Sequence, residues 1–325
     1  MTAKVKFIVG IPSFNRPRIL GLALLRLLLH RKRIAGVVVV ADADNRQYLG
    51  QYKEILENYE DKLDIIYETH YGRRGSAKAR NRVLEIAEQL ASNDNYALIT
   101  YEDEYLCPLQ DWLSPIQRWL RDKSIGIVGG RVVNLRRRRV DPDFTLNILP
   151  GLADSLTRLT GFIFLDTKHG PRYVDFTTHL MAIRIDVIRK GVRYDPEYRG
   201  TGYREESDLQ QQARKLGYKI VFEPNFYVYH LNLDVGGDRA INTAPQRFYW
   251  KTRNNVYFIK KHGMGLNKLI TSTTIIVAYS IVYGMETLKA SLKAFKDAVK
   301  IAPIKPVSAP SPSHAHANNT SFSHR

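Results

Sequence analysis

The sequence predicts an α/β fold, with a mainly parallel central sheet that carries helices on both faces and a C-terminal helical extension. Short β-branched runs alternate with helix-length segments over the first hundred residues, and this β-α-β order produces parallel strands. The 325 residues are enough for a sizeable core. Beyond Gly237 the strand patterns stop, and helical patterns continue to about residue 300.

The first half of the chain holds four apolar runs with the composition of buried strands. They lie at residues 4–11, 36–40, 63–67 and 96–101. Helices are expected between them at residues 18–30, 47–59 and 76–91, the last with apolar residues at helical spacing.

The middle of the chain is less regular. Strands are expected at residues 125–128 and 131–134, around Gly129-Gly130, whereas residues 145–165 fit neither pattern and are expected to loop. The remaining expected elements are strands at residues 174–183, 219–223 and 227–230, and helices at 185–190 and 208–216, the second ended by Gly217.

The C-terminal segment combines basic and apolar residues. A helix is expected at residues 245–262, followed at 269–285 by 17 uncharged residues, the lower limit for a membrane span. Apolar residues then recur at helical spacing, with lysines beside them: Leu288, Leu292, Phe295 and Val299, with Lys289, Lys293, Lys296 and Lys300. This pattern favours a basic amphipathic helix lying on a membrane. A spanning helix and a helix docked on the protein core are the alternatives.

We therefore expect three parts in the chain. They are an α/β domain at residues 1–238, a basic helical extension at 239–301 that could associate with a membrane, and a tail at 302–325. The tail is rich in Pro, Ser, Ala and His, and we expect it to be disordered. The chain opens without a secretory-signal pattern, so we expect a cytoplasmic protein held peripherally at the inner face of the cell membrane.

Charge and cysteine content narrow the possible partners. The net charge is +17, and residues 239–305 carry +10 of it, from twelve Lys or Arg and two acids. Nucleic acid, an anionic membrane surface or a phosphate-bearing substrate could each account for such charge. The single cysteine, Cys107, excludes a disulfide framework and a multi-cysteine metal site.

Polar and charged residues follow each of the first four expected strands. In an open α/β sheet, ligands bind at the carboxyl ends of the strands. The residues there are Pro12-Ser13-Phe14-Asn15-Arg16, Asp42, Gly72-Arg73-Arg74-Gly75 with Arg80-Asn81 beyond it, and Glu102-Asp103-Glu104. Their shared location predicts one binding site at this edge of the sheet.

Two acidic groups are the strongest chemical signals. The three consecutive acids at 102–104 repel one another, and Mg²⁺ or Mn²⁺ would remove that cost while sharing oxygens with substrate phosphates. An acidic loop in solvent is the alternative. The second group, residues 205–208, follows a glycine-bearing loop and begins a helix, where acids are also favoured structurally. His230 ends a short strand, where a metal-binding, acid–base or purely structural role would fit.

These motifs, in this order, resemble the family 2 inverting glycosyltransferases of the GT-A fold. The resemblance covers about residues 5–262 and implies that residues 1–238 are a GT-A catalytic domain. It rests on Ile11-Pro12-Ser13-Phe14-Asn15-Arg16, Ala79-Arg80-Asn81, Glu102-Asp103-Glu104, Tyr203-Arg204-Glu205-Glu206-Ser207-Asp208-Leu209, and residues 217–224 leading to Val228-Tyr229-His230.

The resemblance implies a role for each matching residue. It assigns binding of the nucleotide sugar to Pro12, Phe14, Arg16, Asp42, Arg80, Asn81 and Asp103. It assigns a divalent cation, Mn²⁺ or Mg²⁺, to Glu102, Glu104 and His230. Glu206 matches the catalytic base, with Glu205 and Asp208 as neighbouring candidates.

Two positions depart from the family pattern. Ala41 replaces the first of two consecutive acids after the second strand. Glu stands at both outer positions of the Asp-x-Asp metal motif, and because Glu is one methylene longer, either both Glu side chains reach the ion or Asp103 supplies the ligand. Metal-independent action is the further alternative.

We therefore expect an inverting transferase of hexosyl type. It would move a sugar from a nucleotide-diphospho-sugar to a hydroxyl of a glycan or lipid-linked glycan, by metal-assisted single displacement. A nucleotidyltransferase is one alternative, but the glycine-rich phosphate loop that it needs after the first strand is absent from the sequence there. A basic nucleic-acid-binding protein is the other, and the acids at the sheet edge would repel its phosphates, so nucleic acid is not an expected partner.

Overall fold

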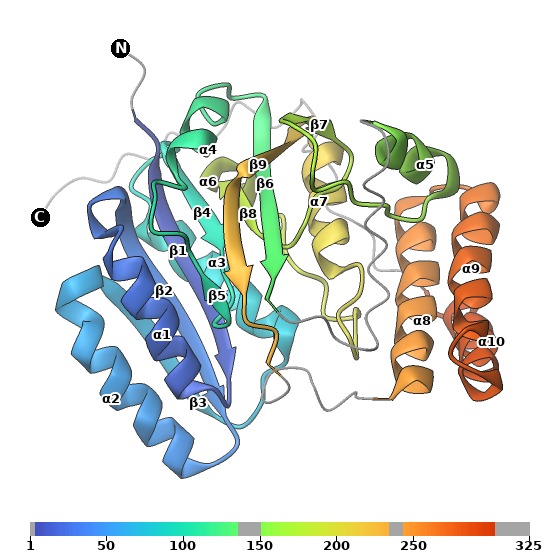
Figure 1. Ribbon diagram of the computed structural model, residues 1–325, viewed down its shortest axis with the longest axis horizontal. Coiled ribbons are helices and arrows are strands. Elements are labelled where there is room, and N and C mark those ends of the chain that lie inside the picture. The colour runs from blue at the N-terminus through green and yellow to red at the C-terminus, as the bar shows by residue number, and fades with distance from the viewer. Residues whose placement is uncertain (1–3, 136–150, 234–242, 303–325) are drawn as a thin grey trace, which may run out of the picture.

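A nine-stranded sheet forms the centre of the molecule in a computed structural model, which describes residues 4–135, 151–233 and 243–302 (Figure 1). Along the sheet the strands follow the order β3-β2-β1-β4-β8-β6-β9-β5, and β7 pairs with β9. Neighbours from β3 to β4 are parallel, as are β6 and β9. The predicted α/β class with a mainly parallel sheet is confirmed.

Strands and helices alternate over the first hundred residues, as predicted. The strands are β1 (Lys6–Phe14), β2 (Ile34–Ala43), β3 (Ile65–Tyr71) and β4 (Tyr96–Thr100). The helices are α1 (Pro17–Leu28), the short 3₁₀ helix η1 (Arg31–Arg33), α2 (Arg46–Leu63) and α3 (Ser76–Leu90).

Helices cover both faces of this half of the sheet, because side chains alternate along each strand. Phe7, Val9 and Ile11 of β1 pack in the same core as the buried residues of α1 and α2. Ile8, between them in sequence, packs in a second core with α3. Valines 37 to 40 of β2 alternate in the same way, so buried β-branched residues stabilise both layers.

The second half of the sheet contains antiparallel strands, because β8 runs against both of its neighbours. Since β8 reverses direction between β4 and β6, the strands β6 and β9 point the same way as β4. The elements here are β5 (Tyr105–Leu106), α4 (Ser114–Trp119), β6 (Ile125–Asn134), α5 (Leu152–Thr160), β7 (Arg172–Val174), β8 (Met181–Arg184), α6 (Ile185–Arg189), α7 (Glu205–Lys215) and β9 (Lys219–His230).

Four predictions in this half are wrong. Residues 125–134 and 219–230 each form one strand, because β6 and β9 pair on both sides of a register shift. The glycines at 129 and 130 indicate close packing rather than a turn: a Cβ on Gly129 would lie 1.8 Å from Thr177 Oγ1. Residues 174–183 divide between β7 and β8, and α5 replaces part of the loop expected at 145–165.

Three helices continue the chain at the end of the molecule beyond α7 (Figure 1). They are α8 (Ala244–His262), α9 (Leu266–Ile281) and α10 (Met285–Val299). Most of α8 is buried, and α9 and α10 pack against it. Within the described ranges no helix is both long and apolar enough to cross a bilayer. The expected disordered tail lies outside the described residues, apart from Ala302.

A buried ionic network joins α8 to α7. Lys261 Nζ lies 2.7 Å from an oxygen of Asp195 and 2.8 Å from an oxygen of Asp208. His262 Nε2 lies 2.7 Å from the other Asp208 oxygen. Burial acts to raise the pKa of Asp208, but the His262 hydrogen bond and the Lys261 charge outweigh it and lower that pKa. The network therefore holds an ionised carboxylate in the interior.

We predict that Lys261→Met lowers the free energy of unfolding by about 3–5 kcal/mol, because it leaves two buried carboxylates without their cation. Urea denaturation at neutral pH measures the change. Lys53→Met, on the exposed surface of α2, is the control and should change stability by less than about 0.5 kcal/mol. Equal stability of the Lys261 variant and the control would contradict the assigned role of the network.

Candidate active site

A cavity of about 570 Å³ lies at the edge of the sheet where β1, β2, β4 and β9 end. Its walls come from these strand ends, from the first turns of α3 and α7, from the segment after α5, and from α8. The carboxyl ends of strands in an open α/β sheet are where ligands usually bind. The predicted site therefore corresponds to an actual cavity.

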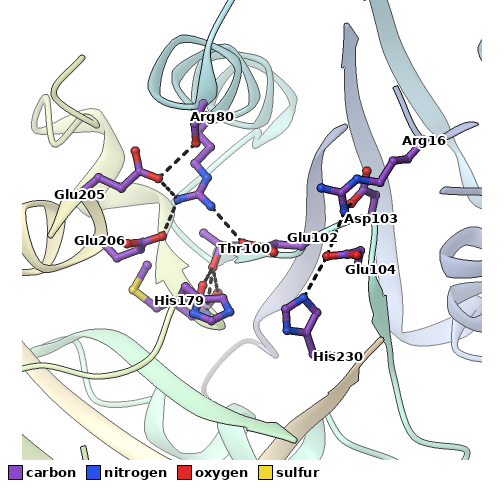
Figure 2. Close-up of polar contacts among 12 residues, drawn as sticks. Arg16, Arg80, Thr100, Glu102, Asp103, Glu104, His179, Glu205, Glu206 and His230 are labelled. Carbon is purple, nitrogen blue, oxygen red and sulfur yellow. Dashed lines mark hydrogen bonds and ion pairs between the residues drawn. The ribbon is translucent and has the colours of Figure 1, made fainter. Parts of the chain in front are cut away.

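The three acids after β4 point in different directions, as Figure 2 shows. Glu102 and Glu104 lie with His230, and one ligand atom from each residue lies within 4.8 Å of the other two. His230 Nε2 is 3.1 Å from Glu104 Oε2. Asp103 points instead toward the end of β1. There it accepts hydrogen bonds from Ser13 Oγ at 2.6 Å and, just beyond the strand, from Arg16 Nη1 at 3.0 Å.

Glu102 and Asp103, which point in different directions, have opposite pKa shifts. Burial acts to raise the pKa of Glu102, but the charges of His179 and Arg80 outweigh it and lower that pKa to about 2. Burial dominates at Asp103 and raises its pKa to about 6, despite the charge of Arg16. An ionised carboxylate is what a cation needs as a ligand.

Glu102, Glu104 and His230 fit a divalent cation. Two carboxylates and one imidazole offer two negative charges and three donor atoms, and carboxylates suit Mn²⁺ and Mg²⁺. These acids also pair with arginines: Arg16 lies 3.0 Å from Glu104, and Arg80 lies 3.0 Å from Glu102. Glu102 and Glu104 therefore both reach one point beside His230, and Asp103 does not.

Arg80 links this group to the acids of α7. Its Nη1 lies 2.7 Å from Glu205 Oε1 and 2.6 Å from Glu206 Oε1. Burial acts to lower the pKa of Arg80, but the nearby carboxylates outweigh it and raise that pKa. The resemblance assigned Arg80 to the nucleotide sugar, and in the structure it contacts three carboxylates at the cavity (Figure 2).

The two adjacent acids of α7 differ in access. The side chain of Glu205 is 4% exposed and also accepts a hydrogen bond from Ser76 Oγ at 3.1 Å. The side chain of Glu206 is 23% exposed and lines the cavity. Both lie in the first turn of α7, where the helix dipole favours negative charge. Glu205 lines the cavity as well, so Glu206 is the more accessible of two carboxylates that face it.

Arg204 fixes the beginning of α7. Its backbone has φ 78°, a left-handed conformation that is uncommon outside glycine. Its buried guanidinium donates to Asn255 Oδ1 of α8 and, at 2.7 Å, to the carbonyl of Gly161. Together with the Lys261 network, this contact ties the position of the α7 acids to α8.

Most residues that the sequence assigned to the nucleotide sugar line the cavity. They are Pro12, Phe14, Arg16, Asp42, Arg80 and Asp103. Burial raises the pKa of Asp42, which accepts a hydrogen bond from the backbone N–H of Arg74 at 2.8 Å. Arg73 lies over the Phe14 ring, 5.2 Å from its centre.

Two predicted site residues do not line the cavity. Asn81 forms two 2.8 Å hydrogen bonds with the backbone of Tyr194, so it holds a neighbouring loop instead of a ligand. Asp208 is fully buried against Lys261 and His262. Both residues lie on helices beside cavity residues, but on faces that turn toward other parts of the protein.

Sequence reasoning did not single out His179. Its ring centre is 6.4 Å from that of His230, and it is the charge that lowers the pKa of Glu102 most. It precedes β8, and the insertion of β8 between β4 and β6 brings it to the acidic group. Because that insertion is a long-range feature, no local motif indicates it.

The remaining wall comes from segments far apart in the sequence. The segment after α5 and residues 177–179 both line the cavity. Two basic residues of α8, Arg247 and Lys251, join them, and Lys251 Nζ lies 4.7 Å from the centre of the Tyr203 ring. This side therefore combines apolar and basic groups.

Known proteins share this fold. No protein-family model matches the chain. A stretch of 124 residues, 37% of the chain, is 34% identical to chondroitin synthase of Pasteurella multocida (strain Pm70), and the match covers only 12% of that protein.

Two solved structures match almost the whole chain. TarS 1-349 of S. aureus in complex with UDP-GlcNAc has a TM-score of 0.58 and 14% identity, covering 91% of this chain and 81% of that one. Mannosyltransferase PcManGT of Pyrobaculum calidifontis in complex with GDP-Man and Mn²⁺ has a TM-score of 0.53 and 16% identity, covering 93% and 77%. These likenesses confirm the predicted GT-A fold and the resemblance of the chain to GT-A glycosyltransferases.

We predict that Mn²⁺ binds to the purified protein and that His230→Ala or Glu102→Gln weakens this binding at least about tenfold, because each removes one of three ligand atoms. Isothermal titration with MnCl₂ measures the affinity. His169→Ala, which removes a histidine paired with Asp166, is the control and should leave it unchanged. Equal Mn²⁺ affinity in all four proteins would show that the cation binds elsewhere.

Proposed function

We propose that the protein is an inverting glycosyltransferase that moves a sugar from a nucleotide-diphospho-sugar to an acceptor hydroxyl. One observation carries the proposal. A single cavity contains the Glu102, Glu104 and His230 group and, across Arg80, the accessible carboxylate of Glu206. A cation site beside a candidate general base suits a donor that carries a diphosphate and an acceptor that must lose a proton.

The donor would bind along the ends of β1, β2 and β4. Phe14 and Asp42 line the part of the cavity formed by β1 and β2, where they can contact the base and ribose. Glu102, Glu104 and His230 would hold Mn²⁺ or Mg²⁺. A bound cation would offset the negative charge that develops on the departing nucleoside diphosphate. The complexes of TarS with UDP-GlcNAc and of PcManGT with GDP-Man and Mn²⁺ support this mode of donor binding.

The reaction would be a single displacement. The acceptor oxygen forms a bond to the anomeric carbon while the bond from that carbon to the diphosphate oxygen breaks. The acceptor proton moves to Glu206, whose side chain becomes a carboxylic acid and later releases the proton to solvent. Because the acceptor attacks from the face opposite the leaving group, the anomeric configuration inverts.

Arg80 would position the base for this step. It contacts Glu205 and Glu206 from one side and Glu102 from the other, so it fixes the separation between the base and the cation group. Proton transfer requires such fixed geometry before a suitable pKa can be useful. Arg80 therefore acts as a positioning residue.

The acceptor would enter from the side formed by the segment after α5 and by α8. Phe162, Ile163 and Leu165 give this wall an apolar part, and Arg247 and Lys251 give it a basic part. A hydroxyl of a glycan or of a lipid-linked glycan fits a wall of this mixed character. The identity of donor and acceptor can be found by a thermal-shift screen of nucleotide sugars with and without Mn²⁺, because ligands stabilise the folded state.

We predict that Glu206→Gln lowers the rate of sugar transfer at least about a hundredfold, because the amide cannot accept the proton. Nucleotide binding, measured by titration calorimetry, should stay within about twofold, since the amide keeps the size of the side chain. Glu54→Gln, on the exposed surface of α2, is the control.

Two outcomes would contradict the mechanism in different ways. Transfer at the wild-type rate by the Glu206 variant would show that another group is the base. A product whose anomeric configuration is retained, determined by NMR, would exclude single displacement altogether.

A further inference from the structure

The connection between α9 and α10 exposes three large apolar side chains. Ile281 is 59% exposed, Val282 is 76% exposed and Met285 is 66% exposed. They lie within five residues of one another, around Gly284, whose φ of 96° turns the chain between the helices. We call residues 281–285, which carry these three exposed side chains at the turn between the helices, the hairpin tip.

Small residues, not large ones, attach α10 to the rest of the protein. Its buried residues recur at helical spacing: Thr287, Ser291, Ala294 and Ala298. Lys260 of α8 donates to the carbonyl of Val299, and Tyr249 of α8 donates to Asp297 at 2.8 Å. The docking predicted as an alternative therefore occurs, mainly through small residues, while Leu288 and Phe295 of the apolar stripe are half-buried.

The apolar stripe of α10 lies beside this buried face and stays partly accessible. Leu292 is 49% exposed and Val299 is 45% exposed. On α9, Leu266 and Ile270 are 68% and 55% exposed one turn apart, at the end of the helix far from the hairpin tip. Single exposed apolar residues are common on protein surfaces, but the hairpin tip and the accessible part of the α10 stripe follow one another along the chain and indicate a binding surface.

Lysines occupy the side of α10 opposite the buried residues. Four of them recur at helical spacing and all are exposed: Lys289, Lys293, Lys296 and Lys300. The acids of this helix do not cancel them, because Glu286 pairs with Lys289 alone, at 2.8 Å, and Asp297 accepts a hydrogen bond from Tyr249. A helix with apolar and basic sides next to each other is typical of proteins that lie in the headgroup region of a membrane.

We propose that the hairpin tip and the lysine side of α10 dock on an anionic phospholipid bilayer. The apolar tip would enter the headgroup region, and the lysines would contact the lipid phosphates. Charge favours this occupant over a second copy of the chain, because a symmetric contact would bring the same four lysines together. The proposal does not depend on the proposed function, since this surface lies outside the cavity.

Co-sedimentation of the full chain with vesicles tests the proposal. One vesicle set is pure phosphatidylcholine, and the other contains about one third phosphatidylglycerol, a composition with strong negative surface potential. The protein should sediment with the anionic vesicles, and increasing salt should weaken this binding. We expect Val282→Asp with Met285→Asp, and separately Lys293→Glu with Lys296→Glu, each to lower the partition coefficient at least about tenfold.

Matched variants control for charge and for hydrophobicity. Leu109→Asp replaces an equally exposed apolar residue in the loop before α4, and Lys53→Glu with Lys123→Glu reverses two exposed lysines elsewhere. Both controls should bind vesicles like the wild type. All altered side chains are exposed, and unchanged thermal unfolding would show that the folds are intact.

Three results would overturn the proposal. The first is an absence of wild-type binding to either vesicle set. The second is an equal loss of binding in the controls and in the α10 variants. The third is a wild-type protein that is a dimer by analytical ultracentrifugation, while the variant with Val282→Asp and Met285→Asp is a monomer. In this case neither protein binds vesicles. That outcome would assign the surface to self-association.

Discussion

The partly buried guanidinium of Arg80 makes the contacts on which the candidate active site depends. It joins carboxylates from two segments a hundred residues apart in sequence, Glu102 after β4 and the acids that begin α7. Without a cation between them, three acids around one cavity would repel one another and raise each other's pKa. Arg80 removes this cost in the free protein and keeps the acidic group and Glu206 at a fixed separation.

The C-terminal helices support the same arrangement from the other side. Arg204, at the start of α7, is held by Asn255 of α8, and Asp208, one turn later, is held by Lys261 and His262. The α7 acids are therefore fixed between α3 and α8. A helical segment that the sequence presents as an extension thus contributes both to the wall of the cavity and to the positions of its acids.

Local patterns predicted the first half of the fold well, because each strand there is a β-branched run and a segment of helical pattern separates it from the next strand. The local patterns failed where packing between distant segments determines the structure. The Gly129-Gly130 pair is typical of a turn but serves close contact with Thr177 and Phe226. His179 lies near enough to Glu102 to lower its pKa, and Asn81 binds the backbone of Tyr194 outside the cavity. Both positions likewise depend on how distant segments pack together. Which carboxylates come together with His230 depends on side-chain directions that the sequence does not reveal, since Asp103 turns to Ser13.

The proposed function requires one cavity that binds a cation and a nucleotide sugar together. A crystal structure with Mn²⁺ and the donor found by the thermal-shift screen, with the ion located from its anomalous scattering, tests this most directly. We expect one Mn²⁺ bound by Glu102, Glu104 and His230, in contact with the donor diphosphate, and an anomeric carbon that faces Glu206. An ion or a nucleotide bound outside this cavity, with Arg80 still joining the same carboxylates, would contradict it.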